Sequence, residues 1–285
     1  MFFNCPKVRV FLHHLPHYLK LLPRDIKLYF KQKKYNNAPI GTITAYIANS
    51  GTPFGSGKTL SSVKKLVEIY RKYNGLTVYH NGKFVKQYIR IFSNIDINCA
   101  GAVRIRCLEE YSDYIESHHD FEDRYVCYLH VDEAGTEFNS RAFSGNFTPD
   151  FISDIVTCRH NWSSFLYTTQ EFGMVDKLLR SVTTNLYACS HTGRIFYNQS
   201  YLPKQVENVD DISMLKPLTT SGYLATDALY NTYDTHARFE RMSKEVKDGQ
   251  TLSVDEIISR KEGDSAYNYV SLSRKGKRFF KRKNK

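Results

Sequence analysis

The stretch Gly51-Thr52-Pro53-Phe54-Gly55-Ser56-Gly57-Lys58-Thr59 decides the fold of this chain. It follows a β-rich run at residues 42–47 and precedes residues 60–73, where apolar side chains recur with helical periodicity. Strand, glycine-rich loop and helix in this order make a phosphate-binding unit, because small residues let successive backbone amides turn inward around phosphate oxygens at a helix amino end. The stretch therefore predicts a P-loop.

Each residue late in the loop has an expected contact with a bound nucleotide. Lys58 is expected to reach the β- and γ-phosphates, and Thr59 to supply a hydroxyl to Mg2+. The usual spacing is G-x-x-x-x-G-K-[ST]; here Thr52 stands at the first glycine position and Gly51 one residue earlier, so the loop is one residue longer. Nucleotide binding is still favoured over an ordinary surface turn. The residues expected to hold ATP are Gly55, Ser56, Gly57, Lys58, Thr59 and Leu60.

Two carboxylates follow a second core strand. Residues 125–131 form a continuous apolar run, which is typical of a strand buried on both faces of a parallel sheet, and Asp132 and Glu133 come directly after it. We expect Asp132 to hold Mg2+ through water and Glu133 to polarise the attacking water. The alternative is that two acids end a strand by chance. The pair favours ATP hydrolysis over a kinase or a GTPase.

Gln170 comes just after the next expected strand, at residues 164–168. In a parallel sheet this position faces the γ-phosphate, so Gln170 is expected to hydrogen-bond the attacking water and to sense the nucleotide state. The alternative is a polar residue that simply leaves a strand.

Strands alternate with helices through residues 38–211, which predicts an α/β P-loop NTPase domain with a mostly parallel central sheet flanked by helices, of the RecA-like, additional-strand type. The dipeptide at 81–82, Asn-Gly, predicts a β-hairpin. The expected strands are 42–47, 77–79, 84–85, 88–92, 125–131, 164–168 and 185–189, and the expected helices are 60–73, 107–117, 150–158 and 174–182.

The two segments outside this domain are basic. Residues 1–37 form a basic amphipathic segment, expected as one or two helices broken at Pro16 and Pro23, and packing on the core is favoured over binding to nucleic acid or an anionic membrane. Residues 212–285 form a C-terminal extension that ends in a flexible basic tail. The run 274–283 suits nucleic acid, although an anionic bilayer or a solvated tail would also explain it.

Composition narrows the classes of protein further. The net charge of +11 indicates an acidic partner. The six cysteines include no Cys-x-x-Cys pair, which favours reduced thiols over a metal site. No apolar stretch is long enough to span a bilayer and no signal peptide is recognisable, so we expect a cytoplasmic protein without a transmembrane segment.

The motifs together resemble those of the zonula occludens toxin family of filamentous phages, the gene I type assembly ATPases, within the DNA-translocating P-loop motors. The resemblance covers roughly residues 40–195, with two departures: Phe54 is inserted in the loop, and Asn161-Trp162-Ser163 replaces a glycine-rich turn. Family members also commonly carry a transmembrane segment after the ATPase domain. The motifs that carry the resemblance are Gly51-Thr52-Pro53, Gly55-Ser56-Gly57-Lys58-Thr59, Ser93-Asn94-Ile95, Val131-Asp132-Glu133-Ala134, Phe138-Asn139-Ser140-Arg141, Arg159-His160, Thr169-Gln170 and Asp176 to Arg180.

This resemblance implies an ATP-driven motor that packages or extrudes single-stranded phage DNA. It implies a homo-oligomeric ring, such as a hexamer, in the host cytoplasm or peripheral to the inner membrane, with virion or inner-membrane assembly proteins as partners. In ring motors an arginine from one subunit commonly completes the next subunit's site. Arg141, Arg159 and Arg180 are the candidates here, with Arg159 narrowly preferred, and for each of them a surface salt bridge is the favoured alternative. The alternative is a nucleotide-gated scaffold that links a membrane partner to virion components without translocating DNA.

Overall fold

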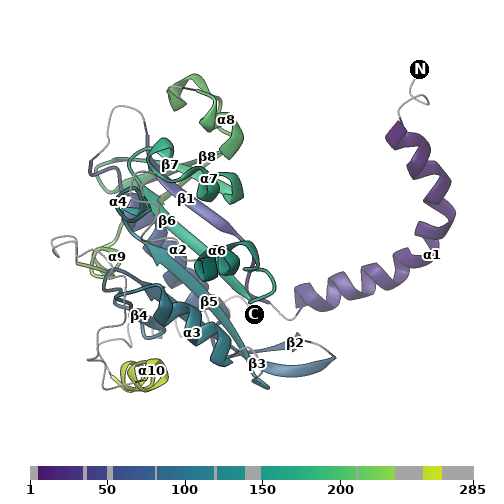
Figure 1. The fold of residues 1–285 in the computed structure, drawn as a ribbon, viewed down its shortest axis with the longest axis horizontal. Coiled ribbons are helices and arrows are strands. Elements are labelled where there is room, and N and C mark those ends of the chain that lie inside the picture. Colours follow the sequence, from purple (N-terminus) through teal and green to yellow (C-terminus); the bar gives the residue numbers. More distant parts are fainter. Residues whose placement is uncertain are drawn as a thin grey trace, which may run out of the picture.

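A mostly parallel β-sheet forms the centre of the protein (Figure 1). The computed structural model describes residues 6–34, 37–49, 54–80, 82–118, 121–138, 149–209, 211–234 and 253–264. Within these ranges the sheet has the order β2-β3-β5-β6-β1-β7-β8-β9, and β4 pairs with β3. The strands are β1 (Ile43–Ala48), β2 (Leu76–His80), β3 (Lys83–Ser93), β4 (Ala102–Arg104), β5 (Arg124–Val131), β6 (Ser163–Thr169), β7 (Asn185–Thr192), β8 (Ile195–Tyr201) and β9 (Thr219–Leu224).

The central strands β3, β5, β6, β1 and β7 run parallel, so their carboxyl ends lie at one edge of the sheet. Antiparallel pairing is confined to the two sides, where β2 pairs with β3 and the strands β7, β8 and β9 form a meander. β1 is buried along its whole length and lies between β6 and β7. The expected P-loop NTPase fold is confirmed, with the P-loop strand in the middle of the sheet.

Helices cover both faces of this sheet (Figure 1). Alternate residues of β1 divide between the two layers: Ile43, Ala45 and Ile47 pack with α3, α6, α7 and α8, whereas Tyr46 packs with α2. The helices after the loop are α2 (Lys58–Tyr73), α3 (Glu109–His118), α4 (Ala134–Glu137), α6 (Pro149–Val156), α7 (Lys177–Val182), α8 (Pro203–Glu207), α9 (Asp227–Tyr230) and α10 (Val254–Gly263), with 3-10 turns η3 (Phe172–Met174) and η4 (Ile212–Met214).

Most expected elements are present with shifted ends. The hairpin at 81–82 is confirmed, with Gly82 at φ 87°, but the two strands expected at 84–85 and 88–92 are the single strand β3. The helix expected at 174–182 starts later: η3 comes first, and Asp176 caps α7 by accepting a hydrogen bond from the Leu178 amide at 2.7 Å. That cap explains why the helix begins at Lys177.

The segment before β1 differs from expectation. It is one helix, α1 (Pro6–Lys34), which continues through Pro16 and Pro23. In Figure 1 it extends away from the sheet and its helices. None of its described side chains is buried, so the expectation that it packs on the core is wrong.

Beyond Asp211 the chain continues the structured body, because β9 adds a strand next to β8 and α10 packs at the β4 side through buried Ile258. The basic run at 274–283 and the loop residues 51–53 lie outside the described residues. None of the helices in the described ranges combines the length and the hydropathy that crossing a bilayer needs.

Candidate functional site

The end of the loop and the start of α2 form a cradle at the carboxyl edge of the sheet. Gly55 and Gly57 have left-handed backbones, with φ of 70° and 86°, and Gly57 is the residue that precedes α2. A Cβ on Gly57 would come within 2.3 Å of the Phe196 ring. Ser56 is buried, and its Oγ has no hydrogen-bond partner among the described residues. A phosphate oxygen would supply that partner, so the cradle fits a polyphosphate.

Asp132 meets the loop through its carboxylate. Its Oδ1 accepts hydrogen bonds from Thr59 Oγ1 at 2.8 Å and from Thr168 Oγ1 at 2.7 Å. Asn94 fixes the backbone of the same residue, since its side chain accepts from the Asp132 amide at 2.8 Å and donates to the Asp132 carbonyl at 3.0 Å. Residues from α2 and from the ends of β3, β5 and β6 thus place one carboxylate beside the threonine hydroxyl.

A second chain of contacts joins Lys58, Gln170 and Glu133. Lys58 Nζ donates to Gln170 Oε1 at 2.8 Å, and Gln170 Nε2 donates to Glu133 Oε1 at 3.0 Å. The Gln170 side-chain amide therefore bridges the Lys58 ammonium and the Glu133 carboxylate, which is expected to act as the base. Lys58 is only 5% exposed, although it carries a charge. A buried cation at the amino end of a helix is suited to an anionic ligand.

Glu133 is held in an uncommon conformation. Its φ of 51° and ψ of 47° are left-handed, and its amide donates to Thr168 Oγ1 at 2.9 Å. Burial, together with the adjacent Asp132 charge, raises the pKa of Glu133, while Lys58 and the Gln170 hydrogen bond lower it to a smaller degree. A carboxylate with a raised pKa and a fixed direction is suited to accepting a proton from water.

His130 lies under the site, on the α2 side of β5. Its ring hydrogen-bonds Ser62 of α2 at 2.8 Å and Ser93 of β3 at 2.9 Å. Burial lowers the pKa of His130 to about 4, so the ring is neutral near pH 7. It fastens α2 to two strands, and the Asp132 charge acts on its ring in the opposite direction to burial.

The residues present fit a magnesium ion held the way nucleotide sites hold it. Thr59 Oγ1 and Asp132 Oδ1 are neighbouring oxygens, and Mg2+ usually takes its remaining ligands from water and phosphate. Within the described ranges, no group of three or more His, Cys, Asp and Glu side chains is placed to hold a metal by itself. The expected ion thus depends on a bound nucleotide for most of its ligands.

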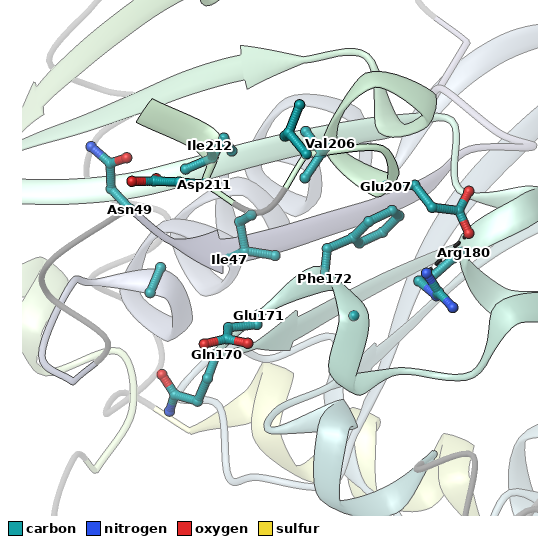
Figure 2. Close-up of a pocket in the computed structure, with 13 residues that line it drawn as sticks. Ile47, Asn49, Gln170, Glu171, Phe172, Arg180, Val206, Glu207, Asp211 and Ile212 are labelled. Carbon is teal, nitrogen blue, oxygen red and sulfur yellow. Dashed lines mark ion pairs between the residues drawn. The ribbon is translucent and has the colours of Figure 1, made fainter. Parts of the chain in front are cut away.

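A cavity of about 640 Å³ adjoins Gln170 on the face opposite α2 (Figure 2). Figure 2 shows Ile47, Phe172 and Val206 toward its interior and Gln170 at its margin. Arg180 and Glu207 form an ion pair at 2.9 Å on one side. The Arg180 guanidinium is therefore already paired within its own chain.

Of the other residues expected at the site, Leu60 lies in the first turn of α2 with its side chain packed against Phe196 and Ala225. Arg159 lies elsewhere, against Gly41, just before β1 and β6 begin. That is the amino edge of the sheet, opposite the Asp132 carboxylate. Arg141 lies outside the described residues.

Four residues that shape the site had no role assigned from the sequence: Asn94, Thr168, His130 and Phe196. The first two follow or end core strands, and polar residues at such positions were a usable signal. Phe196 comes from β8, and nothing in the order of residues indicates that it touches the loop.

Comparisons with known proteins give a family match and similar solved structures. The family model described as Zonular occludens toxin (Zot) matches residues 46–258, which include Lys58, Asp132 and Gln170. The solved N-terminal domain of zonular occludens toxin from Neisseria meningitidis is 17% identical, with a TM-score of 0.45 over 69% of this chain and 100% of that one. The genome packaging NTPase B204 of Sulfolobus turreted icosahedral virus 2, in complex with ATP-gammaS, is 9% identical, with a TM-score of 0.39 over 64% and 97%. Curated protein sequences give no match.

Proposed function

Since this chain belongs to the zonular occludens toxin family, matched over residues 46–258, we propose that it is an ATP-hydrolysing motor that moves single-stranded DNA during phage assembly. The observation that carries the ATPase part is the meeting of Thr59, Asp132 and Glu133 at one edge of the sheet, with Gln170 between Lys58 and Glu133. This arrangement supports the proposal, because it would bring a triphosphate, a metal ion and a base to one place.

The proposed reaction is transfer of the γ-phosphoryl group to water. Loop amides and Lys58 hold the β- and γ-phosphates, and Gln170 positions the attacking water. Glu133 accepts a proton from that water while the water oxygen forms a bond to the γ-phosphorus. The bond to the β-phosphate oxygen breaks, which gives ADP and phosphate. Thr59 and Asp132 would hold Mg2+, which would supply positive charge to the phosphate oxygens.

The DNA part of the proposal is supported by charge and by family. The chain has a net charge of +11, which favours a polyanionic partner. A homo-oligomeric ring is the form in which such a motor would enclose a strand.

The test is ATP turnover by the full chain, with and without single-stranded DNA. We expect Mg2+-dependent turnover that DNA stimulates, and at least about a hundred-fold loss of kcat in Glu133→Gln, because this change removes the base and keeps the shape. Glu116→Gln, an exposed carboxylate on α3, is the matched control and should retain parental turnover. Equal activity of Glu133→Gln and the parent would exclude the assigned base. Turnover that no DNA changes would favour the scaffold role over the motor.

A further inference from the structure

The helix α1 has apolar side chains in water. Leu12, Leu19, Ile26 and Phe30 are 45%, 54%, 46% and 63% exposed. No described side chain of this helix is buried. Exposed apolar residues that gather on one side of a helix indicate a contact surface.

Helical spacing separates the two kinds of side chain. At about 100° per residue, residues 12–30 of α1 divide into a sector that holds apolar residues and an opposite sector that holds basic residues and His13. The apolar sector contains Leu12, Leu15, Leu19, Leu22, Ile26 and Phe30; the basic sector contains Lys20, Arg24 and Lys27. Asp25 is the single acidic residue within the helix.

We propose that α1 lies in the plane of an anionic membrane surface. In that position the apolar sector enters the boundary between headgroups and acyl chains, and the lysines and arginines contact lipid phosphates. DNA would neutralise the basic sector but leave the apolar sector in water. A spanning orientation is excluded by the helix's charges and hydropathy.

The two prolines fit this placement. Pro16 and Pro23 are seven residues apart, so they lie on the same side of the helix, at the border between the two sectors. Each leaves one backbone carbonyl without its helical donor. At the border these carbonyls remain within reach of headgroup water.

The experiment is flotation of the full chain with vesicles. The parent should float with vesicles of phosphatidylglycerol and phosphatidylcholine at least about ten-fold more than with phosphatidylcholine alone. The triple variant Leu19→Gln, Ile26→Gln, Phe30→Gln keeps every charge and should lose at least about ten-fold of this binding. Its matched control, Val10→Gln, Leu21→Gln, Leu28→Gln, changes three exposed apolar residues outside the apolar sector and should retain binding.

A third variant, Lys20→Gln, Arg24→Gln, Lys27→Gln, should lose the preference for phosphatidylglycerol. All three variants should bind ATP like the parent, because α1 lies away from the loop. Absence of flotation of the parent, or equal flotation of the Leu19, Ile26, Phe30 variant, would overturn the proposal. If that variant instead changes the oligomeric size without lipid while the parent does not float, α1 contacts a second copy. If the parent does not float and single-stranded DNA binding falls only in the basic-sector variant, α1 contacts nucleic acid.

Discussion

Among the loop residues that the structure describes, Gly57 tolerates a side chain least. Its φ of 86° strains any residue with a Cβ, at a cost of about 1–2 kcal/mol, and an added Cβ would meet the Phe196 ring at 2.3 Å. We expect Gly57→Ala to weaken ATP binding by more than about ten-fold, measured by titration calorimetry, because strain and clash both displace the phosphate cradle.

Gly55→Ala is the matched control for this prediction. Gly55 has a similar φ of 70°, but a Cβ there would meet nothing within 4 Å, so only the strain applies and the loss should be smaller. Adding Phe196→Ala to Gly57→Ala should restore part of the affinity by making room. Equal losses in the two glycine variants would contradict the role given to Phe196.

At this scale the sequence predicts the residues that contact the nucleotide but not those that hold them. Lys58, Thr59, Asp132 and Glu133 have fixed positions relative to a strand end, and parallel strand ends meet at one edge. Thr168, by contrast, accepts from Glu133 and donates to Asp132 only because β5 and β6 are neighbours in register. Such a contact depends on which strands pair in the sheet, and this pairing cannot be predicted from the residues next to Thr168 in the sequence.

Among the elements, α2 is fastened to the sheet by a buried histidine. His130 bonds Ser62 of α2 and Ser93 of β3, and burial lowers its pKa to about 4, whereas an unfolded histidine titrates near 6.5. As the pH falls, His130 therefore takes up a proton in the unfolded chain before it does so in the folded chain. The stabilisation from the neutral, buried ring is complete above pH 6.5 and is lost as pH falls toward 4. Between pH 7 and pH 5 the free energy of unfolding should fall by about 2 kcal/mol from this group alone.

Urea unfolding at pH 7 and pH 5 measures that difference. His130→Gln should be less stable at pH 7 and should lose most of the pH dependence, since a Gln side chain does not titrate. Exposed His160→Gln should keep the parental difference between the two pH values. A parental pH dependence in His130→Gln would show that another group is responsible.

α1 shows where reasoning from local pattern fails at the scale of elements. A proline removes one hydrogen bond and bends a helix, but the turns on either side of Pro16 and Pro23 keep their own bonds, so the helix continues. Packing on the core was a reasonable expectation for an apolar face. It fails because α2 already covers one face of the sheet, and α3, α6 and α7 cover the other.

Across the whole molecule, the sheet extends further along the chain than its pattern indicates. β9 pairs with β8 along its full length, yet its side chains are mostly exposed. An edge strand in which Tyr223 alone packs inward shows no alternation of apolar and polar residues, so period-two patterning could not reveal it. The domain limits at residues 37 and 211 remain predictions.

The placement of Arg159 makes the expected contact between subunits testable. It lies at the amino edge of the sheet, and the seven residues of β6 put roughly 20 Å between it and its own Gln170. Arg159 is therefore too far away to contact a γ-phosphate in its own site, and we propose that it acts in a neighbouring subunit. We expect Arg159→Ala to lower kcat by at least about a hundred-fold while ATP affinity stays parental.

Mixing two inactive variants isolates this effect. Arg159→Ala subunits keep Glu133, and Glu133→Gln subunits keep Arg159, so a mixed ring contains interfaces with both residues intact. ATP turnover of the mixture should exceed that of either variant alone. A mixture as inactive as its components, under conditions where subunits exchange, would remove Arg159 from this role.

The contact of Phe196 with Gly57 has a mechanical consequence. Phe196 belongs to β8, which forms with β9 an outer antiparallel pair of strands where Ile195 and Leu224 are exposed. Because the Phe196 ring packs against Gly57, the β8–β9 pair cannot shift toward α2 without displacing the backbone of the phosphate-binding loop. A partner that binds this edge of the sheet and moves β8 would therefore also move the nucleotide-binding loop.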